Sequence, residues 1–432
     1  MPTLATGSRS LWSLIVAETL CLLGAEVARF GISVWIYEET RSVGAFSLLL
    51  LANLVPGLLA HPIAGSVVDR SSRKAVMIGA SLVSLAGTAI VLAGALVGSL
   101  SMTLVIIGAA LASVADSFQW PALAASVPLM ASDAELPKYN GLIESGRAIG
   151  RFAGPAIGGL AIAFIGVTGL VAIEAITFVI ATAVVAAIAI PRPSGDDEAE
   201  AESLWRDMSL GFRWIFAAKP LLKFLLVATF ANFFLAICEV VLQPYGLSFL
   251  SERSYGIANA MFGAGMIVGG LLSGPLSRRM TNLAQCLLAA VGVGATFIGF
   301  GFCRGVIGYA ALNLVTASLM TAGNVAAMTI WQIEVPDELQ GRVFSAMQMV
   351  ADLTTPAAFA LAAPITESVM PSVFPKLGGA TVWGAPPTGV MAALFAVMGV
   401  VMIAGFLLAA TVGDIRKLSR APEPDDADHQ QA

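Results

Sequence analysis

The stretch Gly65-Ser-Val-Val-Asp69-Arg70-Ser-Ser-Arg73-Lys74 lies between two long apolar runs, residues 42–68 and 73–98. A helix needs about 20 mostly apolar residues to cross the ~30 Å hydrocarbon core of a bilayer. Both runs exceed that length, and the charged stretch is too short to form a domain of its own. It therefore predicts a polar loop that joins two membrane-spanning helices.

The composition of the whole chain agrees with this interpretation. Of 432 residues, 57% are hydrophobic and 12% are charged, whereas a soluble domain has about 25% charged residues. A net charge of −5 offers nothing to phosphate, so we expect a lipid bilayer as partner and no nucleic acid. The four cysteines lie in apolar runs and form no CxxC or Cys/His cluster, which argues against a metal site.

Reading outward from the loop gives twelve apolar runs and predicts an all-α membrane protein. The predicted spans are residues 10–37, 42–68, 73–98, 101–130, 137–166, 168–190, 219–250, 254–277, 281–302, 305–334, 338–370 and 385–412. Most arginines and lysines fall in loops on the same side as the two termini. By the positive-inside rule, we expect a multi-pass protein of the inner (plasma) membrane with both termini in the cytoplasm.

One long polar stretch divides the spans into six and six. We predict a six-helix bundle over 1–190, a cytoplasmic linker over 191–218, a second six-helix bundle over 219–415 and a disordered tail over 416–432. Apolar residues at helical spacing from Leu204 to Phe216 favour an interfacial helix in the linker. Matching features in the two halves, such as Pro155 and Pro356, indicate a duplicated unit.

The loop between spans two and three resembles the cytoplasmic loop signature of the major facilitator superfamily. Its residues are Gly65, Asp69, Arg70, Arg73 and Lys74. Glycine permits close helix approach, and an acid favours the start of the next helix, where it can pair with Arg73. The alternative is a basic loop that only sets topology.

A second motif lies in span five and resembles the antiporter motif of drug–proton exporters in that superfamily. It reads Gly150-Arg-Phe-Ala-Gly154-Pro155-Ala-Ile-Gly158-Gly159. Its glycines free one helix face for close contact and its proline bends the helix, as a moving contact between the two halves requires. An ordinary small-residue packing face is the alternative.

The resemblance extends along nearly the whole chain and is strongest to the branch that holds macrolide effluxers and siderophore exporters. It implies two pseudo-symmetric six-helix bundles that expose a central cavity alternately to each side of the membrane. In the second half, Arg278 stands where the first half has Asp69. The acidic residue of the loop motif is therefore present in the first half alone.

Ionisable residues within spans cost about 2.5–3.5 kcal/mol each at the bilayer centre, so each one needs a reason. Here they form polar stripes, which we expect to face a shared, water-accessible interior. The candidate proton-coupling and substrate residues are Glu26, Arg29, Asp116, Glu144, Arg147, Arg151, Glu239 and Asp352. Candidate cavity-lining residues are Gln119, Trp120, Asn232, Gln243, Asn313 and Asn324.

Two alternatives concern these charges. Glu26–Arg29 and Glu144–Arg147 have helical i,i+3 spacing and can be neutralised pairs that only hold helices together. Arg151 has no partner in its own helix, and Asp116 or Glu26 are candidates. Glu174 is interpreted as a solvated or structural residue.

The sequence contains no nucleotide-binding signature and no catalytic constellation, so we predict a transporter rather than an enzyme. We expect no cofactor, because a proton gradient would drive transport. The prediction is a monomeric proton-coupled antiporter that exports a small apolar or amphiphilic compound such as a drug, natural product or siderophore. The alternatives are a uniporter or symporter that imports, and a non-transporting receptor or scaffold.

Overall fold

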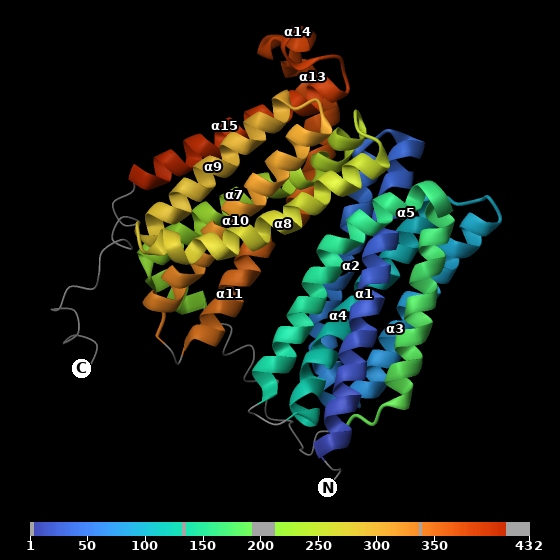
Figure 1. Ribbon diagram of the computed structural model, residues 1–432. Helices are drawn as coiled ribbons and strands as arrows, with labels where there is room; N and C mark the ends of the chain where they lie inside the picture. Colours follow the sequence, from blue (N-terminus) through green and yellow to red (C-terminus); the bar gives the residue numbers. More distant parts are fainter. Residues whose placement is uncertain (1–3, 132–134, 192–211, 337–338, 412–432) are drawn as a thin grey trace, which may run out of the picture. The chain divides into compact units, whose positions relative to one another are not determined.

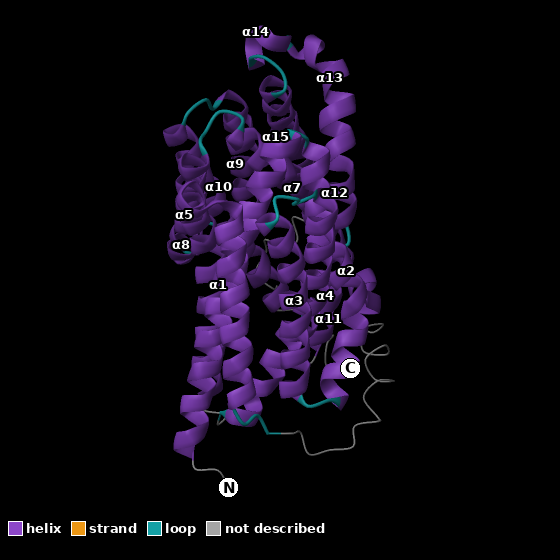
Figure 2. Cartoon of the chain, turned by 90° about the vertical axis from the view of Figure 1, so that its right-hand side faces the viewer, coloured by secondary structure: helices purple, strands orange, loops and turns teal. Residues whose placement is uncertain are grey.

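The computed structural model describes residues 4–131, 135–191, 212–336 and 339–411. Nearly all of these residues are helical, and none of them forms a strand (Figures 1 and 2). Eleven helical stretches within them are long and apolar enough to cross a membrane, and one of these, Met349–Leu377, is made of several short elements. The predicted all-α membrane protein is confirmed.

The first four predicted spans correspond to single helices. These are α1 (Leu4–Thr40), α2 (Val43–Arg70), α3 (Arg73–Leu96) and α4 (Met102–Met130). Polar caps fix two of the starts: the hydroxyls of Ser42 and Ser101 accept hydrogen bonds from the backbone N–H groups of Ala45 and Leu104. Such caps satisfy backbone donors that a helix leaves without partners at its first turn.

The fifth and sixth predicted spans form one long element, α5 (Leu136–Ala187). Its 52 residues would extend about 78 Å if straight, far more than one bilayer crossing needs. Gly166 interrupts it with φ 62° and ψ −178°, a backbone conformation open to glycine. The bend at Gly166 separates two spans and accounts for twelve crossings in eleven helical stretches.

The second half begins with α7 (Lys219–Leu247), α8 (Glu252–Ser277), α9 (Asn282–Phe302) and α10 (Val306–Glu334), and it ends with α15 (Thr388–Thr411). Between the last two lie shorter elements: α11 (Gln340–Asp352), α12 (Thr355–Ala363), a π-helical turn (Pro364–Val369), α13 (Met370–Val373), a 3₁₀ turn (Phe374–Leu377) and α14 (Gly379–Trp383).

The eleventh predicted span, 338–370, is therefore not one continuous helix. A turn at residues 353 and 354 separates α11 from α12. Pro356 lies in the first turn of α12, where the missing backbone N–H of proline costs least. Pro155, the residue that matches Pro356 in the first half of the sequence, lies in the interior of α5 and not in a first turn.

Contacts group the chain into two units. The first is built from α1 to α5 together with residues 240–260 and 362–367, and the second holds the other described residues. The two units do not coincide with the two halves of the sequence, because residues 240–260 and 362–367 of the second half belong to the first unit. The predicted boundaries at 190 and 219 stay a prediction.

Within the first unit, three apolar clusters include residues of α1. One contains Leu11, Leu14 and Ile15, the next Ala17 and Cys21, and the third Ala28 and Ile36. Glu18 and Glu26 lie between the first and the third cluster along the helix, on another face from Ala17 and Cys21. The packing of α1 thus combines apolar contacts along its whole length with acids in its middle part.

The end of the linker packs into the second unit. Residues 212–217 are helical, and Ile215 is buried in an apolar cluster with Leu221 and Trp331. Most of the predicted interfacial helix, from Leu204, and the predicted tail from residue 416 lie outside the described residues.

Candidate functional site: a charged cavity in the first unit

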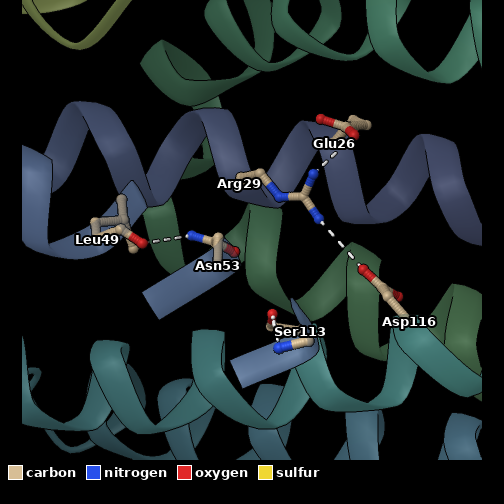
Figure 3. A network of polar contacts seen from close by, with 7 residues as sticks. Glu26, Arg29, Leu49, Asn53, Ser113 and Asp116 are labelled. Atoms are coloured by element: carbon tan, nitrogen blue, oxygen red, sulfur yellow. Dashed lines mark hydrogen bonds and ion pairs between the residues drawn. The ribbon is translucent and has the colours of Figure 1, made fainter. Parts of the chain in front are cut away.

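An arginine on α1 joins two carboxylates from different helices. Arg29 Nη1 lies 2.8 Å from Glu26 Oε1, one helical turn earlier on α1. Its Nη2 lies 3.8 Å from Asp116 Oδ2 on α4 (Figure 3). The guanidinium is planar and presents several donors in a fixed geometry, which suits it to bridging two acids.

These three side chains border open space rather than apolar packing. Asp116 is 62% exposed, Arg29 39% and Glu26 15%. All three line a cavity of about 240 Å³. The cavity lining also includes Ile15, Glu18, Thr19, Cys21, Leu22, Ala25, Ser81, Ser84, Gln119, Trp120, Leu123, Ile143, Gly146, Arg147, Arg151 and Phe178.

Two further contacts order the polar wall of this cavity. The side-chain amide of Gln119 donates a hydrogen bond of 2.7 Å to Glu18 Oε1 and ties α4 to α1. The guanidinium carbon of Arg147 lies 4.0 Å from the ring centroid of Trp120, a cation–π contact between α5 and α4. Carboxylates, an aromatic surface and arginines thus line the same cavity.

The antiporter-motif glycines act through packing on α1. A Cβ placed on Gly150 would lie 2.9 Å from Leu22 Cγ, on Gly154 2.5 Å from Glu26 Cβ, and on Gly158 3.0 Å from Phe30 Cδ1. These three positions recur every four residues, so they share one helix face. They bring α5 against α1 at the level of Glu26.

The sequence predicts that this motif forms a contact between the two halves of the chain. Three of its glycines form a contact within the first half instead. Gly150, Gly154 and Gly158 pack against α1 of their own unit. Gly159 points elsewhere, since an added Cβ there would lie 2.9 Å from the Glu252 carbonyl oxygen and from Gly256 Cα on α8. Neighbouring residues of a helix face different directions, which explains why one motif serves two contacts.

A second, smaller cavity adjoins the first. It has a volume of about 40 Å³ and shares Ala25 and Arg29 with the larger cavity. Its polar lining comprises Arg29, Asn53, Thr88 and Glu174. The Asn53 amide donates to the Leu49 carbonyl within α2 (Figure 3).

The cytoplasmic-loop motif is described in part. Arg73 Nη1 lies 3.3 Å from the Ser71 carbonyl oxygen, and Lys74 Nζ lies 2.6 Å from the Ala186 carbonyl oxygen in the last turn of α5. A cation there interacts favourably with the C-terminal end of a helix. Gly65, Asp69 and Arg70 belong to α2 by their backbone. Their surroundings lie outside the described part of the structure.

The structure brings together seven of the predicted site residues. Glu26, Arg29, Asp116, Arg147, Arg151, Gln119 and Trp120 all line the larger cavity. Arg151 was considered as a partner for Asp116 or Glu26, but Arg29 occupies that position for both acids. The side chains of Glu144 and Asp352 lie outside the described part.

The other candidates lie elsewhere in the described structure. Gln243 donates to the Ser33 hydroxyl at 2.5 Å, Asn313 is buried in α10, and Asn324 and Glu239 are exposed. Asn232 is half-buried on α7. None of them lines either cavity of the first unit, and their predicted role stays a prediction.

Sequence reasoning did not select two acids that the cavities include. Glu18 shares a face of α1 with Glu26 and Arg29, and that shared face was the available signal. Glu174 gave no such signal, because its neighbours in space come from other helices. Among the described residues, no group of three or more His, Cys, Asp or Glu side chains is placed to hold a metal ion.

The long apolar helices and the charged, aromatic cavity of the first unit are features of a polytopic membrane protein. The family model for the Major Facilitator Superfamily matches residues 14–359. The chain therefore belongs to this superfamily, as its sequence predicted, and it is a transporter rather than an enzyme.

The chain is similar to curated efflux proteins at low identity. It is 24% identical to macrolide efflux protein A of Streptococcus pyogenes, over 83% of this chain and 89% of that protein. It is 22% identical to the multidrug efflux pump Tap of Mycobacterium tuberculosis, over 77% of this chain and 81% of that protein.

Among solved structures, a bacterial homologue of the human lysosomal transporter Spinster aligns with a TM-score of 0.70 at 15% identity, covering 98% of this chain and all (100%) of that one. The two chains therefore share one fold over nearly their whole length.

Proposed function

We propose that the protein is a proton-coupled antiporter that exports a small apolar or amphiphilic compound. The observation that supports this most is the position of Arg29, which lies between the Glu26 and Asp116 carboxylates on the wall of a cavity. The macrolide and multidrug efflux pumps to which the chain is similar favour export and an apolar cargo.

The chemistry follows from one cation shared by two acids. When Asp116 is ionised, it competes with Glu26 for the guanidinium; when it is protonated, Arg29 pairs with Glu26 alone. Protonation in this cluster and a cationic group of the cargo would thus both change the pairing of Arg29. For exchange, the two must favour different conformations, since a ligand shifts an equilibrium only by its differential affinity for the two states.

The cavity walls also fit an amphiphilic cargo. Trp120 and Phe178 supply aromatic surface, and Asp116 supplies an exposed charge. Drug-sized molecules occupy pockets of about 300–1,000 Å³, so the cavity of about 240 Å³ would hold part of such a molecule. Proton energy, in place of a cofactor, would drive the cycle.

The test is transport by purified protein in proteoliposomes with an acidic interior. A macrolide and a cationic dye are the probes, and we expect the vesicles to accumulate them above the outside concentration until a protonophore collapses the pH difference. Asp116→Asn and Glu26→Gln should each reduce this accumulation by about tenfold, within the usual range of coupling free energies. Glu334→Gln, at the exposed end of α10, is the matched control.

Other outcomes identify the alternatives. Equilibration without accumulation indicates a uniporter, movement of cargo together with protons indicates a symporter, and an absence of flux for every probe indicates a receptor or scaffold. Normal accumulation by both acid variants would contradict the site assignment.

We also propose a monomer in the inner membrane with both termini in the cytoplasm. The excess of arginine and lysine on the terminal side supports this orientation. Labelling of cysteines introduced at residues 6 and 425 by an impermeant maleimide, in intact cells and in inverted vesicles, tests it. Labelling in intact cells would contradict the assignment.

A further inference from the structure

We propose that Glu174 carries the transported proton, in a compartment separate from the cargo, and that Arg29 couples the two by changing partners between Glu174 and Asp116. This inference rests on the proposed antiport function and adds a residue and a route to it. Glu174 lies on the second part of α5, away from the antiporter motif.

The first argument is one of size. The cavity that Glu174 lines has a volume of about 40 Å³, against about 240 Å³ for the cavity that Asp116 lines. A cavity needs about 10–15 Å³ of such volume to hold one water molecule, and drug-sized ligands occupy pockets of about 300–1,000 Å³. The smaller space therefore admits water and excludes a drug-sized cargo. A group that meets water and not cargo is suited to bind a proton.

The second argument is charge. The acids that line the two cavities are Glu18, Glu26, Asp116 and Glu174, and the cations are Arg29, Arg147 and Arg151. In the described part of the chain, no lysine or arginine lies within ion-pair distance of Glu174. An acid without a salt-bridge partner inside a membrane is stable when it holds a proton.

The third argument is the surroundings of Glu174. Its charged neighbours are Arg29 and Glu26 from α1 and Asp116 from α4, and the Cys21 thiol also lies near it. The Thr88 hydroxyl of α3 and the Asn53 amide of α2 line the same cavity. Thr88 and Asn53 supply the polar partners that an ordered water requires.

Arg29 connects the two compartments because it lines both. While Glu174 is a neutral acid, the guanidinium stays with Glu26 and Asp116, as in this structure. When Glu174 releases its proton to water, it becomes a carboxylate and attracts the guanidinium. Asp116 then loses part of its pairing and becomes available to a proton or to a cationic group of the cargo.

The experiment uses the full-length protein in proteoliposomes and separates two modes of transport. In the first, a pH gradient drives accumulation of a radiolabelled macrolide. In the second, labelled and unlabelled macrolide exchange across the membrane at equal pH, which needs cargo binding and movement but no net proton transfer. The variants are Glu174→Gln, Glu174→Asp and the control Glu334→Gln.

We expect gradient-driven accumulation by Glu174→Gln to fall by about tenfold, while its exchange stays within about twofold of the wild type. Glu174→Asp keeps a carboxylate and should recover the gradient-driven mode. Gradient-driven accumulation at the wild-type level in Glu174→Gln would overturn the inference and leave antiport intact. Loss of both modes in a well-folded variant would assign Glu174 a structural role and overturn the inference as well. If the wild-type protein shows no gradient-driven accumulation, the proposed antiport function fails first.

A second variant covers the case in which Glu174→Gln does not fold. Asn53→Leu fills the smaller cavity with an apolar side chain and leaves every acid in place. It should weaken gradient-driven accumulation and spare exchange. Equal gradient-driven accumulation in Asn53→Leu and the wild type would contradict a proton route through this cavity.

Discussion

The two units of the protein organise their interiors differently. The first unit places arginines and carboxylates around a cavity. The interior of the second unit contains an aromatic cluster in which Phe395 stacks on Phe297, with centroids 6.0 Å apart and planes 3° apart, and lies 6.0 Å from Phe300. The two units thus differ in the side chains that their helices enclose.

The difference suggests separate tasks for the two units. Charges inside a membrane are costly and persist where they are used, whereas aromatic packing supplies dispersion contacts that need no solvent. We infer that changes in the first unit alter transport, and that changes in the core of the second alter mainly stability.

The largest expected effect on transport comes from Arg29→Ala. Removing the guanidinium leaves the Glu26 and Asp116 carboxylates facing each other without a cation, so gradient-driven transport should fall by about 100-fold. Stability should also fall, by about 1–3 kcal/mol, less than for a fully buried pair because the Arg29 side chain is 39% exposed. Thermal unfolding in detergent measures the second quantity.

Arg29→Lys is the matched variant for this prediction. It keeps the charge but replaces a planar fork by a single ammonium, which cannot bridge two acids as well. We expect partial transport. Full activity in Arg29→Ala would show that the shared cation has no part in the cycle.

A smaller effect is expected from Gly154→Ala. The new Cβ would meet Glu26 Cβ at 2.5 Å, so α5 and α1 must separate locally. Overpacking of this kind costs about 1–3 kcal/mol, and the shift of Glu26 should lower transport by about fivefold. Thermal unfolding and proteoliposome transport measure the two effects.

Gly79→Ala is the control for that substitution, because nothing lies within 4 Å of a Cβ at Gly79. It should leave both transport and stability unchanged. Equal behaviour of the two alanine variants would mean that close packing of α5 on α1 does not position Glu26.

The smallest effect on transport is expected from Phe395→Ala in the second unit. Loss of the ring removes contacts with Phe297 and Phe300. Since lipid is as apolar as the protein interior, the cost should lie below the 3–5 kcal/mol seen in soluble cores, at about 2 kcal/mol. Transport per folded molecule should stay within about twofold of the wild type. A large loss of coupling in this variant would remove the distinction between the units.

Much of the fold followed from local features of the sequence. Apolar runs and charged breaks located the helices, and the glycine at residue 166 marks the bend that the interrupted pattern predicted. The break after Asp352 was not predicted, although Thr354, Thr355 and Pro356 follow it and a proline disfavours helical backbone in the preceding residue. Hydrophobicity reports the need for burial in lipid or protein, but it does not report helix continuity.

The candidate site was predictable to the extent that it is local. The i,i+3 spacing of Glu26 and Arg29 requires only helical geometry, and the structure contains that pair at 2.8 Å. The contact of Arg29 with Asp116 depends on the packing of α4 against α1 and could not be derived from either helix. For the same reason, the sequence alone does not distinguish Arg151 from Arg29 as the partner of Asp116.

The sequence by itself determined that this chain is a polytopic helical membrane protein of a transporter family, because bilayer thickness and backbone hydrogen bonding leave few alternatives for long apolar runs. Tertiary structure decided that one arginine serves two acids, that the motif glycines support Glu26, and that Glu174 borders a separate small cavity. These contacts join residues up to about 150 positions apart along the chain, and only helix packing specifies which faces meet.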